Sequence, residues 1–289
     1  MTVQIGIVGG DLRIIRLAEM LAKENFKVYT YGLEKYVFAD KNILKCKTLK
    51  DINTCTYVIS GIPFSKDGVY ISTPFSNEQV KVNNLLNLLS NKTLIAGAIN
   101  KEIKTNISSN GLDIIDLMDI EELTIFNIIP TVEGALQIAM EETEYTIHSS
   151  KCLVLGFGRI GKLLTKTLKN MGAEVSCTAR KESDLAWIKT YGYKGIHLDK
   201  LENKLSDNSY DIIFNTVPKV ILDKPKLERI RDKKTIIIEL ASSPGGIDVV
   251  KAQEYNIKII KALGLPGKVA PYTAAKYIKN TLDKIIFNK

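Results

Sequence analysis

Residues 151–161 read Lys-Cys-Leu-Val-Leu-Gly-Phe-Gly-Arg-Ile-Gly, and this stretch decides the fold. The apolar residues 152–155 have the length of a buried strand, glycines follow at once, and a helical pattern then runs to Met171. A second strand is expected at residues 174–179, which completes a strand–turn–helix–strand unit of about 30 residues. A Gly-x-Gly-x-x-Gly motif in that context predicts a Rossmann domain that binds a nicotinamide dinucleotide.

The glycines of this motif have separate physical roles. Gly156 allows the tight turn, Gly158 lets the backbone approach the pyrophosphate, and Gly161 lets the helix pack closely on the strand. The unpaired N–H groups at the helix N-terminus then face the phosphates. The predicted phosphate-binding residues are Gly156, Phe157, Gly158, Arg159, Ile160 and Gly161.

The residues after the second strand indicate NADP rather than NAD. Domains that bind NAD carry an acidic residue there, which accepts hydrogen bonds from the ribose hydroxyls. Here the sequence is Thr178-Ala179-Arg180-Lys181. Arg180 can pair with a 2′-phosphate through two hydrogen bonds, and Lys181 adds a second positive charge. The alternative is that both are an ordinary solvated basic pair.

Two later strand ends are assigned to the nicotinamide-ribose side of the cofactor site. Open α/β sheets bind ligands at the carboxyl ends of their strands. The stretches concerned are residues 215–218 (NTVP) and 239–243 (ELASS), and within them the predicted cofactor contacts are Thr216, Val217, Pro218 and Ser242. Plain strand-end turns would explain the same residues equally well.

Apolar runs of strand length alternate with helical patterns along the whole chain. This order predicts an α/β fold of two doubly wound parallel-sheet, Rossmann-like domains joined by a linking helix that Pro130 opens. The expected boundaries are residues 1–128 for a substrate domain and residues 129–270 for the NADP-binding domain. A helix over residues 271–289 is expected to pack back on the first domain, by analogy with two-domain dehydrogenases.

Residues 5–13 also run from strand through a glycine turn into a helix, but no second dinucleotide site is expected there. The third glycine is missing, and Asp11 stands at the helix start, where a carboxylate caps the helix itself. Arg13 is unusual in a first turn, because the helix dipole disfavours a cation there. A nearby anionic ligand would explain it; the alternative is an exposed arginine.

Composition excludes several classes of function. The chain has 289 residues, 45% hydrophobic and 25% charged, and a net charge of +8 that is spread along the sequence, so nucleic acid is not an expected partner. No apolar run approaches about 18 residues, so no membrane association is expected. The four cysteines form no Cys-x-x-Cys pair and there are only two histidines, so no metal site is expected. The cysteines are expected to be free thiols in the cytoplasm.

Six stretches resemble one known family. They are residues 9–13 (GGDLR), 129–135 (IPTVEGA), 154–161 (VLGFGRIG), 178–181 (TARK), 239–242 (ELAS) and 264–271 (GLPGKVAP). Together they resemble the dipicolinate synthase A subunits over essentially the whole chain. The resemblance implies a cytoplasmic enzyme of the mother cell of a sporulating bacterium, which makes pyridine-2,6-dicarboxylate together with a flavoprotein-like B subunit. It also implies NADP as oxidant and a dicarboxylate substrate from the diaminopimelate/lysine pathway, either dihydrodipicolinate or 4-hydroxy-tetrahydrodipicolinate.

The implied reaction suggests catalytic roles. Arg13 and Lys268, each expected on the rim of its own domain, are candidate clamps for the two carboxylates of the substrate. Glu133 is the candidate base or water-orienting group, and Thr131 a candidate hydrogen-bond partner of the substrate. The alternative for Glu133 is an acid that only stabilises the start of the helix, and the alternative for Thr131 is a capping role. The substrate site is further expected to include Gly10, Asp11, Gly61, Pro266 and Gly267.

Two other functions fit the same motifs. A D-2-hydroxyacid dehydrogenase shares the two-domain plan but uses a histidine late in the chain, and no histidine follows His197. A non-catalytic NADPH-binding scaffold subunit would bind the cofactor through the same loop without chemistry. The chain is also expected to form an oligomer.

Overall fold

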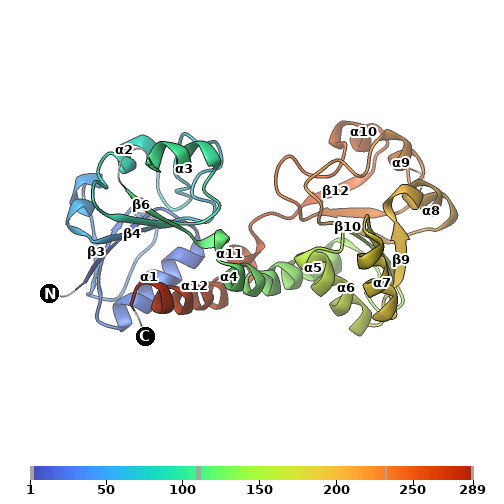
Figure 1. The fold of residues 1–289 in the computed structure, drawn as a ribbon, viewed down its shortest axis with the longest axis horizontal. Helices are drawn as coiled ribbons and strands as arrows, with labels where there is room; N and C mark the ends of the chain where they lie inside the picture. Colours follow the sequence, from blue (N-terminus) through green and yellow to red (C-terminus); the bar gives the residue numbers. More distant parts are fainter. Residues whose placement is uncertain (1–2, 109–111, 232, 288–289) are drawn as a thin grey trace. The chain divides into compact units, whose positions relative to one another are not determined.

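The chain forms two units, each built around a six-stranded parallel sheet (Figure 1). The computed structural model describes residues 3–108, 112–231 and 233–287. Unit 1 comprises Met1–Asn127 and Pro266–Lys289, and unit 2 comprises Ile128–Leu265. All pairings between the named strands are parallel. The predicted fold of two doubly wound Rossmann-like domains is therefore confirmed.

The sheet of unit 1 has the order β3-β2-β1-β4-β5-β6, so the order reverses between β1 and β4. Its strands are β1 (Gln4–Val8), β2 (Lys27–Tyr31), β3 (Ile43–Lys45), β4 (Tyr57–Ser60), β5 (Thr93–Ala96) and β6 (Asp113–Asp116). Its first helices are α1 (Leu12–Lys23), α2 (Val82–Leu86), α3 (Lys101–Ser108) and α4 (Glu121–Phe126), with 3-10 turns at Leu49–Thr54 and Leu117–Asp119. Separate apolar cores cover the two faces: Ile5 and Ile7 face one, and Val8 the other.

The last helix of the chain returns to unit 1. In Figure 1, α12 (Pro271–Ile285) runs alongside α1, and its residues Ala275, Ile278 and Leu282 enter the same apolar core as that helix. The buried ammonium of Lys279 pairs with Glu24 at 2.7 Å, which ties α12 to the end of α1. Residues 288–289 of the predicted helix lie outside the described part of the chain.

The boundary near residue 270 differs from the sequence prediction. Pro266–Val269, which form most of α11 (Leu265–Val269), belong to unit 1 and not to unit 2, which was expected to extend to residue 270. The physical reason is a close approach to the start of α1: a Cβ added to Gly267 would come within 2.7 Å of the Asp11 carboxyl carbon. Only glycine lets the chain lie against that carboxylate.

The sheet of unit 2 has the order β12-β11-β10-β7-β8-β9, with its reversal between β7 and β10. Its strands are β7 (Lys151–Leu155), β8 (Glu174–Ala179), β9 (Lys194–His197), β10 (Ile212–Asn215), β11 (Ile236–Glu239) and β12 (Lys258–Lys261). Its helices are α5 (Ile128–Glu142), α6 (Arg159–Asn170), α7 (Glu182–Thr190), α8 (Leu201–Asp207), α9 (Lys224–Glu228) and α10 (Val249–Glu254), with a 3-10 turn at Leu198–Lys200. Along β7 the side chains alternate between two cores, which explains its continuous apolar run.

A few elements differ from those expected. The edge strands β3 and β9 were not predicted, because each buries only one side chain and lacks an apolar run. Among the described residues, Glu121–Glu142 is long and apolar enough to cross a membrane by length and composition alone, contrary to expectation. Half of the most apolar stretch of this segment is buried inside the protein, as in the core helix of a globular domain.

Candidate cofactor and substrate sites

The predicted phosphate loop connects β7 to α6 and is shaped by two of its glycines. Gly156 has a φ of 98°, a backbone conformation that side chains disfavour, and a Cβ there would lie 2.7 Å from Val217 Cγ2. A Cβ on Gly161 would overlap the Gly156 carbonyl oxygen and lie 2.9 Å from its carbon. These two positions need glycine for the packing of the loop itself.

Gly158 differs from its two neighbours in the motif, because a Cβ there would meet no protein atom within 4 Å. It is the N-cap of α6, no side chain caps that helix, and its first turn carries no acidic residue. The backbone is therefore open to a ligand on this side, and the positive end of the α6 dipole favours an anion there. The residues present fit the pyrophosphate of a dinucleotide.

The end of β8 carries the basic pair that sequence reasoning assigned to the 2′-phosphate. The hydroxyl of the buried Thr178 accepts a hydrogen bond from the Gly156 N–H at 3.0 Å, which joins this strand end to the phosphate loop. Arg180 and Lys181 follow and are exposed. The acidic residues Glu182 and Asp184 lie in the first turn of α7, where they favour the helix dipole.

Sequence reasoning missed His197, which lies beside Arg180 at the end of the neighbouring strand β9. The His197 Nε2 is 3.1 Å from the Arg180 carbonyl oxygen, and its Nδ1 accepts from the Asp199 N–H at 3.3 Å. The second contact leaves the proton on Nε2, so His197 donates to the Arg180 backbone. The register that pairs Ala179 with His197 sets this contact, and no spacing in the sequence indicates it.

The ends of β10 and β11 form a buried polar cluster. Asn215 and Glu239 face each other in the register of these strands, and Asn215 Nδ2 donates to Glu239 Oε1 at 2.7 Å. The Thr216 hydroxyl donates to the Leu155 carbonyl at 2.8 Å, beside the phosphate loop. Of the residues assigned to the nicotinamide side, Thr216 and Val217 are half-buried, whereas Pro218 and Ser242 are exposed. Asn215 and Glu239 belong to the two strand-end stretches that sequence reasoning assigned to the nicotinamide-ribose side, but their contact was not predicted.

In unit 1, Arg13 is 3% exposed and not a surface cation. Its Nε and Nη2 donate to the Asp11 carboxylate at 2.8–3.1 Å, and Nη2 also donates to the Ile62 carbonyl. Asp11 caps α1 as expected, because it accepts from the Arg13 N–H at 3.0 Å. Neither the external anion nor the exposed arginine is needed to explain the position of Arg13, because its charge is matched within the chain.

The remaining predicted substrate residues of unit 1 gather around the start of α1. A Cβ on Gly61 would lie 3.2 Å from the Gly10 Cα, so the segments that follow β1 and β4 are in close contact there. Pro266 and Gly267 are buried, and Lys268 is exposed. Lys268 was expected on the rim of the NADP-binding domain but belongs to unit 1, so both proposed carboxylate clamps lie in the same unit.

Thr131 and Glu133 lie in the first turns of α5, in unit 2. Glu133 is exposed and Thr131 is half-buried. The roles predicted for them stay predictions.

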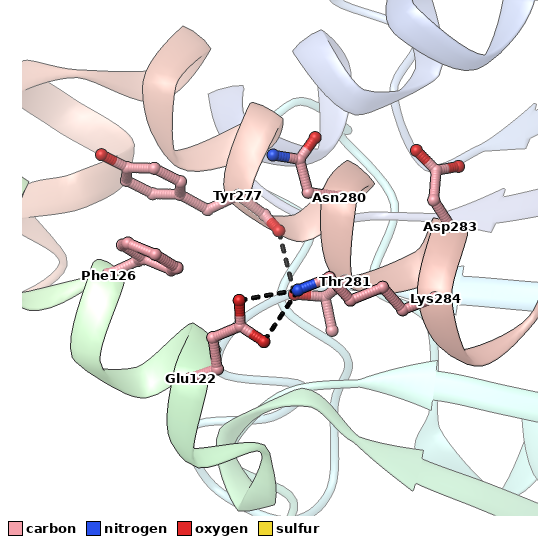
Figure 2. Close-up of a pocket in the computed structure, with 7 residues that line it drawn as sticks. All are labelled: Glu122, Phe126, Tyr277, Asn280, Thr281, Asp283 and Lys284. Carbon is pink, nitrogen blue, oxygen red and sulfur yellow. Dashed lines mark hydrogen bonds and ion pairs between the residues drawn. The ribbon is translucent and has the colours of Figure 1, made fainter. Parts of the chain in front are cut away.

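A hollow of about 350 Å³ between α4 and α12, within unit 1, holds none of the predicted site residues. Figure 2 shows Phe126 stacked on Tyr277, with ring centroids 4.9 Å apart, and Lys284 Nζ between the two carboxylate oxygens of Glu122 at 2.8 and 3.0 Å. Asp283 pairs with the buried Lys279. Because its charges already pair with one another, we attribute this hollow to the packing of α4 on α12.

The cysteines are unsuited to nucleophilic chemistry. Burial raises the pKa of Cys152 and of Cys177 to about 12, so both thiols stay protonated near neutral pH. Within the described ranges, no three His, Cys, Asp or Glu side chains gather into a group that could hold a metal ion.

Two family models match successive parts of the chain. Residues 4–118 match the N-terminal domain of the dipicolinate synthase A subunits. Residues 132–241 match the NAD binding domain of the D-isomer specific 2-hydroxyacid dehydrogenases. The second match agrees with the geometry of the phosphate loop and supports a nicotinamide dinucleotide-binding domain of an oxidoreductase.

Comparison with individual proteins covers the chain from end to end. The dipicolinate synthase A subunit of Bacillus subtilis is 33% identical over 98% of this chain and 95% of its own length. The crystal structure of that Bacillus subtilis protein has a TM-score of 0.86 at 31% identity, covering 100% of this chain and 97% of that one. The dipicolinate synthase A subunit of Bacillus halodurans has a TM-score of 0.85 at 28% identity, covering 99% and 98%. The chain therefore belongs to the family of dipicolinate synthase A subunits.

Proposed function

We propose that this chain is an NADP-dependent oxidoreductase that makes pyridine-2,6-dicarboxylate from dihydrodipicolinate or 4-hydroxy-tetrahydrodipicolinate. The observation that carries the proposal is the open backbone at Gly158, followed across the sheet by Arg180, in a chain of this family. The two candidate substrates differ by one water. Conversion of dihydrodipicolinate to the aromatic ring then removes one hydride and one proton.

The residues of unit 2 would hold the cofactor, which supplies the hydride acceptor when bound. The N–H groups of Arg159, Ile160 and Gly161 bind the pyrophosphate, as at other helix N-termini. Arg180 pairs with the 2′-phosphate, and Lys181 adds a point charge. The residues proposed for the nicotinamide-ribose side are Thr216, Val217, Pro218 and Ser242. The supports for NADP over NAD are these two cations and the lack of an acid directly after β8.

The substrate needs cations for its two carboxylates and a base for its ring proton. Lys268 is the proposed carboxylate ligand with an exposed ammonium. Arg13 would act together with Asp11, because the two side chains are already paired. Glu133 is the proposed base or water-orienting group, and Thr131 the proposed hydrogen-bond partner. The backbone around the α1 start, formed by Gly10, Gly61, Pro266 and Gly267, completes the proposed site.

We further propose that the chain works with a B subunit in the mother-cell cytoplasm of a sporulating bacterium. The reaction would form a branch of the diaminopimelate/lysine pathway. The support is the chain's relationship to proteins that are A subunits of a synthase.

The test is a turnover assay with NADP and the pathway intermediate, with and without the B subunit, that follows both NADPH and pyridine-2,6-dicarboxylate. Formation of the two products in equal amounts supports the proposal. Oxidation of D-2-hydroxyacids instead would favour the second candidate function, to which the match of residues 132–241 points. Tight NADP binding without turnover, even with the B subunit, would indicate a scaffold subunit.

A further inference from the structure

Glu239 ends β11 with its carboxylate buried in unit 2, where only 6% of the residue is exposed. Its Oε1 accepts from Asn215 Nδ2 at 2.7 Å and from the Ala241 N–H at 3.0 Å. Its Oε2 accepts from the Gly246 N–H at 2.9 Å. All these partners are donors, so the surroundings suit the ionised carboxylate, which accepts only.

No cation compensates this charge within the described ranges, where the partners of Glu239 are one amide side chain and two backbone N–H groups. Buried carboxylates usually pair with a cation, because desolvation is costly. A negative charge that a fold holds in place with neutral dipoles acts on any cation that binds nearby, and burial limits its screening by water and salt.

The cluster is rigid and joined to the phosphate loop. Asn215 Oδ1 accepts from the Val217 N–H at 3.2 Å while its Nδ2 also donates to the Val217 carbonyl, so both ends of the amide are oriented. A Cβ on Gly246 would come within 2.9 Å of Asn215 Cγ. A Cβ on Gly156 would lie 2.7 Å from Val217 Cγ2, so the phosphate loop packs against the same residue. Glu239 therefore cannot move without disturbing the loops at this edge of the sheet.

The strand order tells which half of a dinucleotide lies above this cluster. The pyrophosphate loop follows β7, and Arg180 marks the adenosine side after β8. A dinucleotide spans the point where the strand order reverses, so its nicotinamide half extends to the opposite side, over β10 and β11. Asn215 and Glu239 end those two strands.

We propose that the buried charge of Glu239, oriented by Asn215, makes the site bind the oxidised nicotinamide more tightly than the reduced one. The oxidised ring carries a positive charge and the reduced ring is neutral, so only the first is attracted. Glu239 thereby acts as a positioning and electrostatic residue that favours binding of the oxidant and release of the reduced product. This inference rests on the proposed dinucleotide site, and it holds for NAD as for NADP.

The test compares the dissociation constants of the oxidised and the reduced cofactor in Glu239→Gln, by fluorescence titration of the full chain. We expect the preference for the oxidised form to fall roughly three- to tenfold, the effect of one unit charge at moderate range in a partly screened site. The matched control is Asp211→Asn, directly before the neighbouring strand β10, where the carboxylate accepts from the Lys151 N–H at 2.7 Å. It removes the same charge at the amino edge of the sheet, and the preference should not change.

If Glu239 had a purely structural role, Glu239→Gln would weaken the binding of both cofactor forms equally. An unchanged preference for the oxidised form in this variant would therefore overturn the proposal. If that variant does not fold, the wild-type chain decides, because equal or tighter binding of the reduced form contradicts the proposal. The measurement uses whichever of NAD and NADP binds more tightly, so a wrong cofactor or substrate assignment leaves it intact. Failure of the wild type to bind either dinucleotide would overturn both proposals.

Discussion

Two glycines of the phosphate loop, three residues apart, should respond to alanine in opposite ways. At Gly161 a Cβ would overlap the Gly156 carbonyl oxygen and lie 2.9 Å from its carbon, where ordinary contact begins at 3.4 Å. The helix must then move away from β7, at a cost of about 1–3 kcal/mol for overpacking. The better helix propensity of alanine offsets roughly 0.5–1 kcal/mol of that cost. We expect Gly161→Ala to lower the free energy of unfolding by about 1–2 kcal/mol.

At Gly158 the same methyl group meets no protein atom within 4 Å, and its φ of −78° suits any residue. The free energy of unfolding of Gly158→Ala should therefore stay within about 0.5 kcal/mol of the wild type. The methyl group instead occupies the space through which the backbone approaches the pyrophosphate. We expect NADP to bind at least about tenfold more weakly, a loss of roughly 1.4 kcal/mol or more.

Urea unfolding and fluorescence titration of NADP, applied to both variants, separate these effects. Stable Gly158→Ala protein that binds NADP as well as the wild type would refute the assignment of this loop to the pyrophosphate. Gly161→Ala protein as stable as the wild type would show that the close contact of α6 with the loop is relieved without cost.

Four further predictions concern charges and the partner. Arg180→Asp should weaken the binding of NADP by about 1.5–3 kcal/mol and that of NAD much less, because a charge-assisted contact to the 2′-phosphate is lost. Equal losses of affinity in titrations of both cofactors would exclude Arg180 from this role. Lys268→Ala should raise the Michaelis constant for the substrate by a comparable free energy with NADP affinity unchanged, and a fall in NADP affinity would instead place Lys268 in the cofactor site. Arg13→Ala should cost about 2–3 kcal/mol of unfolding free energy, less than for a fully buried pair because the Asp11 side chain is 29% exposed; a wild-type urea midpoint would contradict this. Finally, the isolated chain should bind NADP but make little pyridine-2,6-dicarboxylate until the B subunit is added, and full activity alone would overturn that expectation.

Local order along the chain was enough to predict the phosphate loop. Strand, glycine turn and helix follow one another within residues 151–171, and each is set by contacts between near neighbours in the sequence. The central strands were found for a related reason: they are buried on both faces and are therefore continuously apolar. The edge strands β3 and β9 lack that signal and were missed.

The pairing of Arg13 with Asp11 was not predicted, although the two residues are only two positions apart. Residues two apart on a helix do not face each other, so helical spacing suggests no contact. Asp11, however, is the N-cap and has an extended backbone, with φ −90° and ψ −169°, which turns its carboxylate back toward Arg13. The Ile62 carbonyl also accepts from Arg13, whose side chain is buried, whereas that of Asp11 is partly exposed.

Residue order along short stretches was enough to predict the two Rossmann-like domains, the phosphate loop and the family. Only the tertiary structure placed Lys268 in unit 1, set His197 against the Arg180 backbone and paired Asn215 with Glu239. Strand register and the return of the chain to α1 create these contacts between residues far apart in the sequence. No local periodicity encodes which strand lies beside which, so the charges that surround the cofactor site become visible only once the sheet is assembled.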